Sequence, residues 1–169
     1  MKINKVELTI DGHRYHCSYM GDIDLLKQID FALLCSSKCP GNIIIKTQEL
    51  AFQWREKGLV VAGGFHSPVE KEVLNVLIKG NQPIVICPAR SLQKMRIPKL
   101  WRFGINENRM LIITSIHGSN KRPTIELCNQ RNEFLLKLSE KAYIPYVDPS
   151  GKIVELYNEL KEKDQLISF

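Results

Sequence analysis

The sequence predicts an α/β fold, a three-layer Rossmann-like sandwich with a mainly parallel sheet and a short N-terminal β-hairpin extension. Short apolar runs alternate along the chain with stretches whose apolar residues recur at helical spacing. The runs are apolar throughout, which is typical of parallel strands buried on both faces, and each helical stretch has a single apolar stripe. Right-handed crossovers between such strands give a doubly wound sheet.

The first 30 residues follow a different pattern from the rest. Apolar and polar residues alternate from Val6 to Ile10 and again from Tyr15 to Tyr19, and the dipeptide Asp11-Gly12 between them suits a tight type I′ turn. We therefore expect residues 1–30 to form a β extension that packs on the core, and residues 31–169 to form the Rossmann-like domain.

Strands and helices alternate from Phe31 onwards. The predicted strands are Phe31–Cys35, Leu59–Ala62, Ile84–Cys87, Leu111–Thr114 and Tyr143–Val147, with Leu166–Phe169 as a candidate sixth. Three helices are predicted from their apolar stripes, which are Ile43, Leu50, Ala51 and Trp54 in the first, Val69, Val73, Val76 and Leu77 in the second, and Ile153, Leu156, Tyr157 and Leu160 in the third.

Composition narrows the class of protein. The chain has 169 residues, about the size of one domain, and it is 44% hydrophobic and 25% charged, as is usual for soluble globular proteins. It contains neither an apolar run long enough to span a membrane nor the apolar core of a signal peptide. Five cysteines without a C-x-x-C pair suit reduced thiols, so we expect a cytoplasmic protein. The net charge of +6 favours anionic partners.

Two junctions between an apolar run and a helix have the composition of phosphate-binding loops. In FALLCSSKCPGN and LVVAGGFHSPVE, the run ends at small and hydroxyl residues and a helix follows at once, so that free N–H groups and the positive end of the helix dipole face the ligand side. The first junction lacks both G-x-G-x-x-G and the G-K-[ST] of a Walker loop, so ordinary NAD binding and ATP hydrolysis are unsupported.

The second junction is the better defined of the two. Ser67 fits an N-cap, Pro68 the first helical position and Glu70 the partner in a capping box, while Gly63 and Gly64 before them can take positive φ and let a ligand approach the backbone. The alternative interpretation is a well-capped corner without a ligand.

A basic segment follows the third predicted strand, from Ala89 to Arg109. Two interpretations are open for it: a surface that grips single-stranded nucleic acid by phosphate pairing and base stacking, or an amphipathic helix with a solvated basic face and Trp101 in the core. Lys121 and Arg122 add charge to the same edge of the sheet. The aromatic residues of the segment are Trp101 and Phe103, and its cations are Arg90, Lys94, Arg96, Lys99, Arg102 and Arg109.

Catalytic and metal-binding candidates are few. His66 lies within the second junction, where it could touch a phosphate or a ribose. His13, His16 and Cys17 have no matching distant pair, so we expect no metal site and no cofactor. Cys35 and Cys39 flank the first loop, and we interpret them as small buried residues rather than as nucleophiles.

Several motifs occur in the order found in a known family. SYMGDIDLL is similar to the approach to that family's first strand, LLCSSKCPGN stands in the place of V-G-S-R-x-x-S, and VAGGFHSPVE in the place of S-G-x-A-x-G-I-D-x-x-A-H. Arg131-Asn132-Glu133 followed by Leu138-Ser139 matches R-N-R-x-x-x-x-L-S in spacing, and Ser150-Gly151 matches a later S-G. From Tyr19 to Ser168 the chain thus resembles the Rossmann-like core of the DNA-processing protein A family (DprA, also called Smf), within the superfamily that includes the lysine-decarboxylase-like LOG proteins.

The departures from the family pattern concern charge. Cys35 stands in place of a glycine and Val69 in place of an aspartate, while Ser37 and Glu133 replace arginines. Because each cation on a phosphate-binding edge supports affinity through counterion release, we expect weaker contacts with DNA.

The resemblance implies a binding protein without catalytic activity, whose ligand is single-stranded DNA or a nucleotide phosphate and which takes part in DNA processing or recombination. Members of the family bind single-stranded DNA, deliver it to the RecA recombinase and self-associate, so a RecA-type partner and a homodimer are implied as well. The expected ligand-binding residues are Ser36, Ser37, Lys38, Gly63, Gly64, His66, Ser67, Arg90 and Arg131.

Two alternatives remain open. In a LOG-like phosphoribohydrolase, which cleaves the N-glycosidic bond of a nucleotide, GGFHSPVE would stand for G-G-x-G-T-x-x-E, with Glu70 as the acidic residue and Ser67 as the threonine. Ala62 and His66 depart from that pattern. The other alternative is a small sensor that binds a nucleotide without turning it over.

Overall fold

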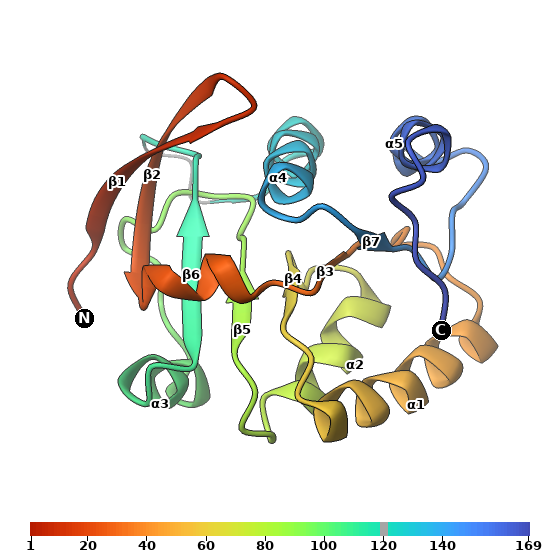
Figure 1. Ribbon diagram of the computed structural model, residues 1–169, viewed down its shortest axis with the longest axis horizontal. Coiled ribbons are helices and arrows are strands. Elements are labelled where there is room, and N and C mark those ends of the chain that lie inside the picture. Colours follow the sequence, from red (N-terminus) through yellow and green to blue (C-terminus); the bar gives the residue numbers. More distant parts are fainter. Residues whose placement is uncertain (119–121) are drawn as a thin grey trace.

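A computed structural model, which describes residues 1–118 and 122–169, has a seven-stranded sheet in the order β1-β2-β6-β5-β4-β3-β7 (Figure 1). The strands are β1 (Asn4–Ile10), β2 (His13–Gly21), β3 (Phe31–Leu33), β4 (Val61–Gly63), β5 (Ile84–Ile86), β6 (Met110–Thr114) and β7 (Ala142–Tyr143). The helices are α1 (Gly41–Lys57), α2 (Pro68–Leu77), α3 (Lys99–Asn106), α4 (Ile125–Leu138) and α5 (Ile153–Glu162), with a 3-10 helix η1 (Ile23–Gln28) before β3.

The central strands pair in parallel, as the sequence predicts. Strands β7, β3, β4, β5 and β6 form the parallel part of the sheet, and Phe31 of β3 lies opposite Val61 of β4. The two junctions therefore follow neighbouring strands and meet at one edge of the sheet, because the carboxyl ends of parallel strands lie on the same side.

Alternate residues of each strand face two separate apolar clusters, which makes the three layers. Phe31 and Leu33 pack on the side covered by α1, α2 and α3. Ala32 and Leu34 pack on the side covered by η1, α4 and α5. The Rossmann-like sandwich predicted from the sequence is confirmed.

The N-terminal hairpin continues the main sheet. Asp11 and Gly12 both have positive φ, 49° and 76°, as a type I′ turn requires. Strand β1 pairs antiparallel with β2, and β2 pairs antiparallel with β6.

Most predicted elements are shorter in the structure: β3 ends at Leu33, β5 ends at Ile86, and β4 spans only Val61–Gly63. Strand β7 ends at Tyr143, before Pro145, which has no N–H to donate to a ladder. Leu166 forms a single parallel bridge with Ala142 and no strand. In the basic segment only Lys99–Asn106 is helical, because Pro98 disfavours helical geometry in the residue before it.

Candidate functional site

A cavity of about 590 Å³ lies where the two junctions meet. The loop after β3 and the start of α2 form one side of it, and the first turns of α4 and α5 form the other. Its lining residues are Cys35, Ser36, Ser37, Lys38, His66, Ser67, Glu70, Pro123, Thr124, Ile125, Cys128, Asn129, Arg131, Asn132, Asp148, Ser150, Gly151, Lys152 and Ile153.

The start of α2 is closed by its own carboxylate. Ser67 caps the helix, Pro68 takes the first helical position, and the capping box with Glu70 is formed as predicted. One oxygen of Glu70, Oε2, accepts the N–H groups of His66 at 2.7 Å and Ser67 at 3.1 Å. The other oxygen, Oε1, accepts the N–H of Cys35 at 3.1 Å. Glu70 is only 2% exposed, and its carboxylate thus occupies the place where a phosphate was expected.

Gly64 makes room for Arg131 rather than for a ligand. Its φ does not lie in the left-handed region, but a Cβ at this position would fall on Nη1 of Arg131, at 1.1 Å. Arg131 comes from the second turn of α4 and is 5% exposed. Its Nε donates to Oδ1 of Asn132 at 2.8 Å and its Nη1 to the carbonyl of Cys87 at 3.2 Å.

Arg131 is a buried cation without a counter-charge. Among the described residues, no carboxylate lies within 4.0 Å of its guanidinium. Its third nitrogen, Nη2, has no hydrogen-bond partner among these residues. Burying an unpaired charge is costly unless a ligand or water neutralises it. Arg131 lines the cavity, so an anion bound there would neutralise its charge.

The loop before α5 closes the opposite wall. The N–H of Asp148 donates to Oγ of Ser36 at 2.8 Å, and Oδ1 of Asp148 accepts the N–H and hydroxyl of Ser150. Two hydrogen bonds from Ser150 hold the pKa of Asp148 below its usual value, and the bond from the backbone N–H has the larger effect. The carboxylate therefore pairs with its own loop and fixes the rim on which Lys152 lies.

The structure brings together most of the residues that the sequence analysis singled out. Ser36, Ser37, Lys38, His66, Ser67 and Arg131 all line the cavity, as does Glu70. Gly63 and Gly64 lie behind this lining, Gly63 against the ring of Phe65 and Gly64 against Arg131. Arg90 is not part of the lining and donates to the carbonyl of Ser91.

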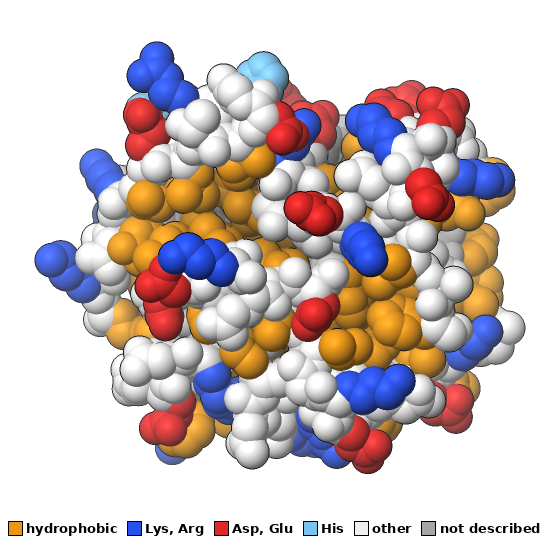
Figure 2. Space-filling model, viewed as in Figure 1, with side chains coloured by type: hydrophobic (Ala, Val, Ile, Leu, Met, Phe, Trp, Pro, Cys, Tyr) orange, Lys and Arg blue, Asp and Glu red, His pale blue; other side chains and the backbone are white. Residues whose placement is uncertain are grey.

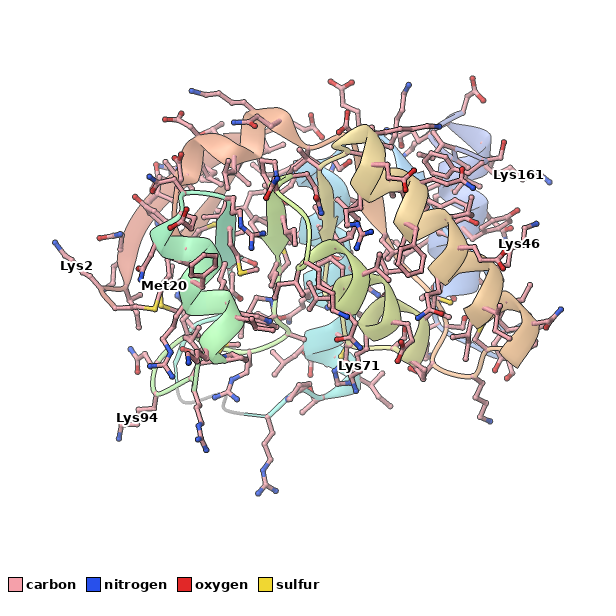
Figure 3. All side chains as sticks on the ribbon, turned by 90° about the horizontal axis from the view of Figure 1, so that it is seen from below. Lys2, Met20, Lys46, Lys71, Lys94 and Lys161 are labelled. Atoms are coloured by element: carbon pink, nitrogen blue, oxygen red, sulfur yellow. The ribbon has the colours of Figure 1, made fainter. Side chains whose placement is uncertain are left out.

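The cations of the basic segment do not lie together, and Lys99 is an exposed residue at the start of α3. Arg90 stays in the loop after β5. Lys94, Arg96 and Arg102 line a different groove of about 360 Å³, whose lining also includes Met20; Met20 and Lys94 are labelled in Figure 3. Arg109 lies at the other edge of the sheet, where its Nη2 donates to the carbonyl of Ile78. Lys121 lies outside the described residues.

Glu133, which replaces a family arginine, lies off the cavity. It is exposed and faces a hollow between α4 and α5 together with Lys137 and Lys163. This replacement therefore removes no cation from the cavity, whereas Ser37 does lie on the cavity wall.

Residues of the first turns of α4 were missed by sequence reasoning. Thr124, Cys128 and Asn129 line the cavity, and the Thr124 hydroxyl caps α4 by accepting the N–H of Leu127 at 3.2 Å. The dipeptide Pro123-Thr124 is a recognisable helix start that could have located this helix.

Cys35 and Cys39, which flank the loop after β3, are not activated as nucleophiles. Burial raises the pKa of Cys35 well above its usual value and also raises that of Cys39. Within residues 1–118 and 122–169, no three His, Cys, Asp or Glu side chains are grouped so as to hold a metal ion. None of the helices formed by these residues has the length and apolar character needed to cross a membrane.

The solved structures that match this chain include two DNA processing proteins. A DNA processing protein A from Helicobacter pylori, described for its single-stranded DNA binding mode, superposes with a TM-score of 0.71 at 17% identity, over 99% of this chain and 90% of that one. DprA from Streptococcus pneumoniae superposes with a TM-score of 0.62 at 17% identity, over 90% of this chain and 62% of that one. No family model and no curated protein matches the sequence. The fold that the motif resemblance implies is thus confirmed: this chain has the Rossmann-like fold of DNA processing protein A.

Proposed function

We propose that this protein binds single-stranded DNA through the cavity at the carboxyl edge of the sheet, and that it acts in DNA processing or recombination. The observation that carries the proposal is Arg131, which is buried, lacks a carboxylate partner among the described residues and lines the cavity. A guanidinium presents a planar fork that matches the oxygens of a phosphate.

The surroundings of Arg131 suit a nucleotide of a flexible strand. The cavity of about 590 Å³ falls in the size range of ligand sites, and Lys38 and Lys152 add cations at its wall. The hydroxyls of Ser36, Ser37 and Thr124 can reach sugar or base atoms. The DNA-binding neighbour from Helicobacter pylori has the same fold and supports the same ligand class.

One face of the molecule shows no basic surface broad enough to carry the proposal. On the face of the molecule seen in Figure 2, Lys and Arg side chains are scattered among acidic ones and form no single patch. The net charge of +6 therefore indicates attraction to anions without locating the binding site.

The LOG-like hydrolase alternative is less well supported. That reaction requires a carboxylate that is free to act on the substrate, and the two oxygens of Glu70 already accept three backbone N–H groups. Both structural neighbours are DNA processing proteins.

Binding of fluorescein-labelled oligothymidine, followed by anisotropy, tests the proposal. Loss of hydrogen bonds to a charged group costs about 1.5–3 kcal/mol, so Arg131→Ala should weaken binding by about 10- to 150-fold. Arg131→Lys keeps the charge but not the fork, and should recover part of the affinity. Lys137→Ala is the matched control, because it removes an exposed cation of the same helix that pairs with Asp11 away from the cavity.

An Arg131→Lys variant that folds and binds oligothymidine as the unmodified protein does would contradict the assignment. So would an unmodified protein that fails to bind oligothymidine at low salt. Thermal melting of each variant separates loss of the site from loss of the fold.

Three further features belong to this proposal because the family resemblance implies them: delivery of DNA to a RecA-type recombinase, self-association, and a cytoplasmic location. The free thiols of Cys17, Cys35, Cys39, Cys87 and Cys128 agree with a reducing compartment. Sedimentation of the protein alone and with a RecA-type recombinase on oligothymidine tests the first two.

A further inference from the structure

Glu70 joins two loops that together form an anion-binding cradle. The N–H groups of His66 and Ser67 come from the start of α2, and the N–H of Cys35 comes from the end of the neighbouring strand. Backbone N–H groups that converge in this way at a helix start bind phosphate in many α/β proteins. In this chain they converge on a side-chain carboxylate instead.

Helix capping alone does not account for this arrangement. A capping box requires the bonds between Ser67 and Glu70, and both are formed. The bond from Cys35 to Oε1 goes further, since it uses the second oxygen of the carboxylate to engage the loop that follows β3. The carboxylate thereby occupies donors from both junctions that a phosphate oxygen would otherwise use.

The charges around the cavity then favour one kind of phosphate. Of the five charged side chains in the lining, only Arg131 and Glu70 are buried, and they form no ion pair with each other; Lys38 and Lys152 are exposed and Asp148 is half-buried. A phosphodiester carries a single negative charge, which one guanidinium can neutralise. A phosphomonoester carries about −1.5 to −2 at neutral pH, so its second charge would meet the buried Glu70 carboxylate.

We propose that Glu70 determines the specificity of the cavity: by filling the cradle, it admits the internal phosphodiesters of single-stranded DNA and turns away terminal phosphomonoesters, including free nucleoside monophosphates. This inference rests on the proposed DNA-binding function, and it assigns to Glu70 a role that is neither catalytic nor only structural.

Competition against labelled oligothymidine tests the inference with two small probes. The dinucleotide TpT contains one phosphodiester and no terminal phosphate, whereas thymidine 5′-monophosphate contains one phosphomonoester. On the unmodified protein, TpT should compete at concentrations at least about tenfold lower than thymidine monophosphate, and a 5′-phosphate on oligothymidine should not raise its affinity.

Glu70→Gln should reverse the preference, because the neutral amide removes the negative charge and frees N–H donors. Thymidine monophosphate should then bind at least about tenfold more tightly than it does to the unmodified protein. Glu72→Gln is the matched control: it makes the same change on the same helix outside the cavity, at a side chain that accepts from Gln48, and should leave the preference unchanged.

The outcomes separate this inference from the proposed function. If TpT and thymidine monophosphate compete equally on the unmodified protein, the inference is wrong even when oligothymidine binding depends on Arg131. If Glu70→Gln melts like the unmodified protein and keeps its preference, the inference is also wrong. If Glu70→Gln does not fold, the comparison of oligothymidine with and without a 5′-phosphate decides. Loss of all oligothymidine binding would instead reject the proposed function.

Discussion

The guanidinium of Arg131 occupies space that is free only because Gly64 has no side chain. A Cβ on Gly64 would coincide with the guanidinium of Arg131, so Gly64→Ala should push Arg131 out of its place. We expect this variant to lose oligothymidine affinity to a similar degree as Arg131→Ala, by about tenfold or more, while Arg131 itself stays in the chain.

Gly41→Ala serves as the control for this prediction. Gly41 is the first residue of α1, and a Cβ there would meet no atom within 4 Å. Anisotropy titration of both variants measures the effect. Unchanged affinity in a folded Gly64→Ala variant would show that the position of Arg131 does not matter for binding.

The residue scale also shows where inference from a family pattern fails. Ser37 and Glu133 both replace family arginines, but only Ser37 lines the cavity. Two substitutions that look alike in a motif therefore have different consequences, because position in the chain does not give the direction of a side chain on its helix.

Helix α4 is the element that the pattern of apolar stripes did not predict. Arg131 and Asn132 are both buried at the centre of this helix, so polar residues interrupt the apolar stripe. The interruption coincides with the cavity, since the buried polar face of α4 is the face that lines it.

The segment between β5 and α3 offers a second contact for a longer strand of DNA. Arg131 donates to the carbonyl of Cys87, and Lys94 follows Cys87 by seven residues, which places the Cα atoms of Cys87 and Lys94 within about 25 Å of each other. A single strand with a site size of about 4–16 nucleotides can cover this span. Lys94, Arg96 and Arg102 line the groove there without an acidic neighbour in its lining.

We expect charge reversal in this groove to affect long oligonucleotides alone. The double variant Arg96→Glu/Arg102→Glu should weaken binding of a 15-residue oligothymidine and reduce the slope of log affinity against log salt by about 0.7 for each phosphate that the groove no longer neutralises. It should leave TpT binding unchanged. A matched control is Lys46→Glu/Lys161→Glu, which reverses exposed cations away from Lys94 (Figure 3). Equal weakening by both double variants would indicate a general charge effect and no specific contact.

At the scale of the whole molecule, the sequence was sufficient for the layers and the parallel order of the strands. Each predicted strand is a short run buried on both faces, so hydrophobicity alone located β3, β4, β5 and β6. Strand β7 was less well predicted, because its pairing consists of Ala142 and Tyr143 and depends on long-range contacts.

The sequence predicted where the candidate site lies, but not all the contacts that its backbone donors make. The two junctions do meet at one edge, which follows from parallel pairing. The local pattern predicted the capping box with Glu70, but the bond from the N–H of Cys35 to the same carboxylate joins two loops that are far apart in the sequence. Likewise, the pairing of Gly64 with Arg131 joins residues that are far apart in the sequence.

The buried thiols of both core layers make the stability of the whole fold sensitive to alkaline pH. Cys35 lies in the cluster under α1 and α2, while Cys17 and Cys87 lie in the cluster under α4. Burial raises the pKa of Cys17 to about 11 and that of Cys87 to about 12, from an ordinary value of 9.0, and also raises the pKa of Cys35. Well below an ordinary thiol pKa of 9.0, these thiols are protonated in both the folded and the unfolded chain, and their contribution to stability is fully present.

Above that pH the unfolded chain releases thiol protons that the folded chain still holds, so the free energy of unfolding falls with rising pH. The decrease should continue up to the folded pKa values, about 11 for Cys17 and about 12 for Cys87. Cys87→Ala should make the decrease in melting temperature between about pH 9 and about pH 11 less steep, because one titrating thiol is removed from the core. Cys128→Ala, at the half-buried rim of the cavity, is the control. Melting curves of the three proteins across this range measure the difference, and parallel decreases for all three would mean that the buried thiols do not govern alkaline unfolding.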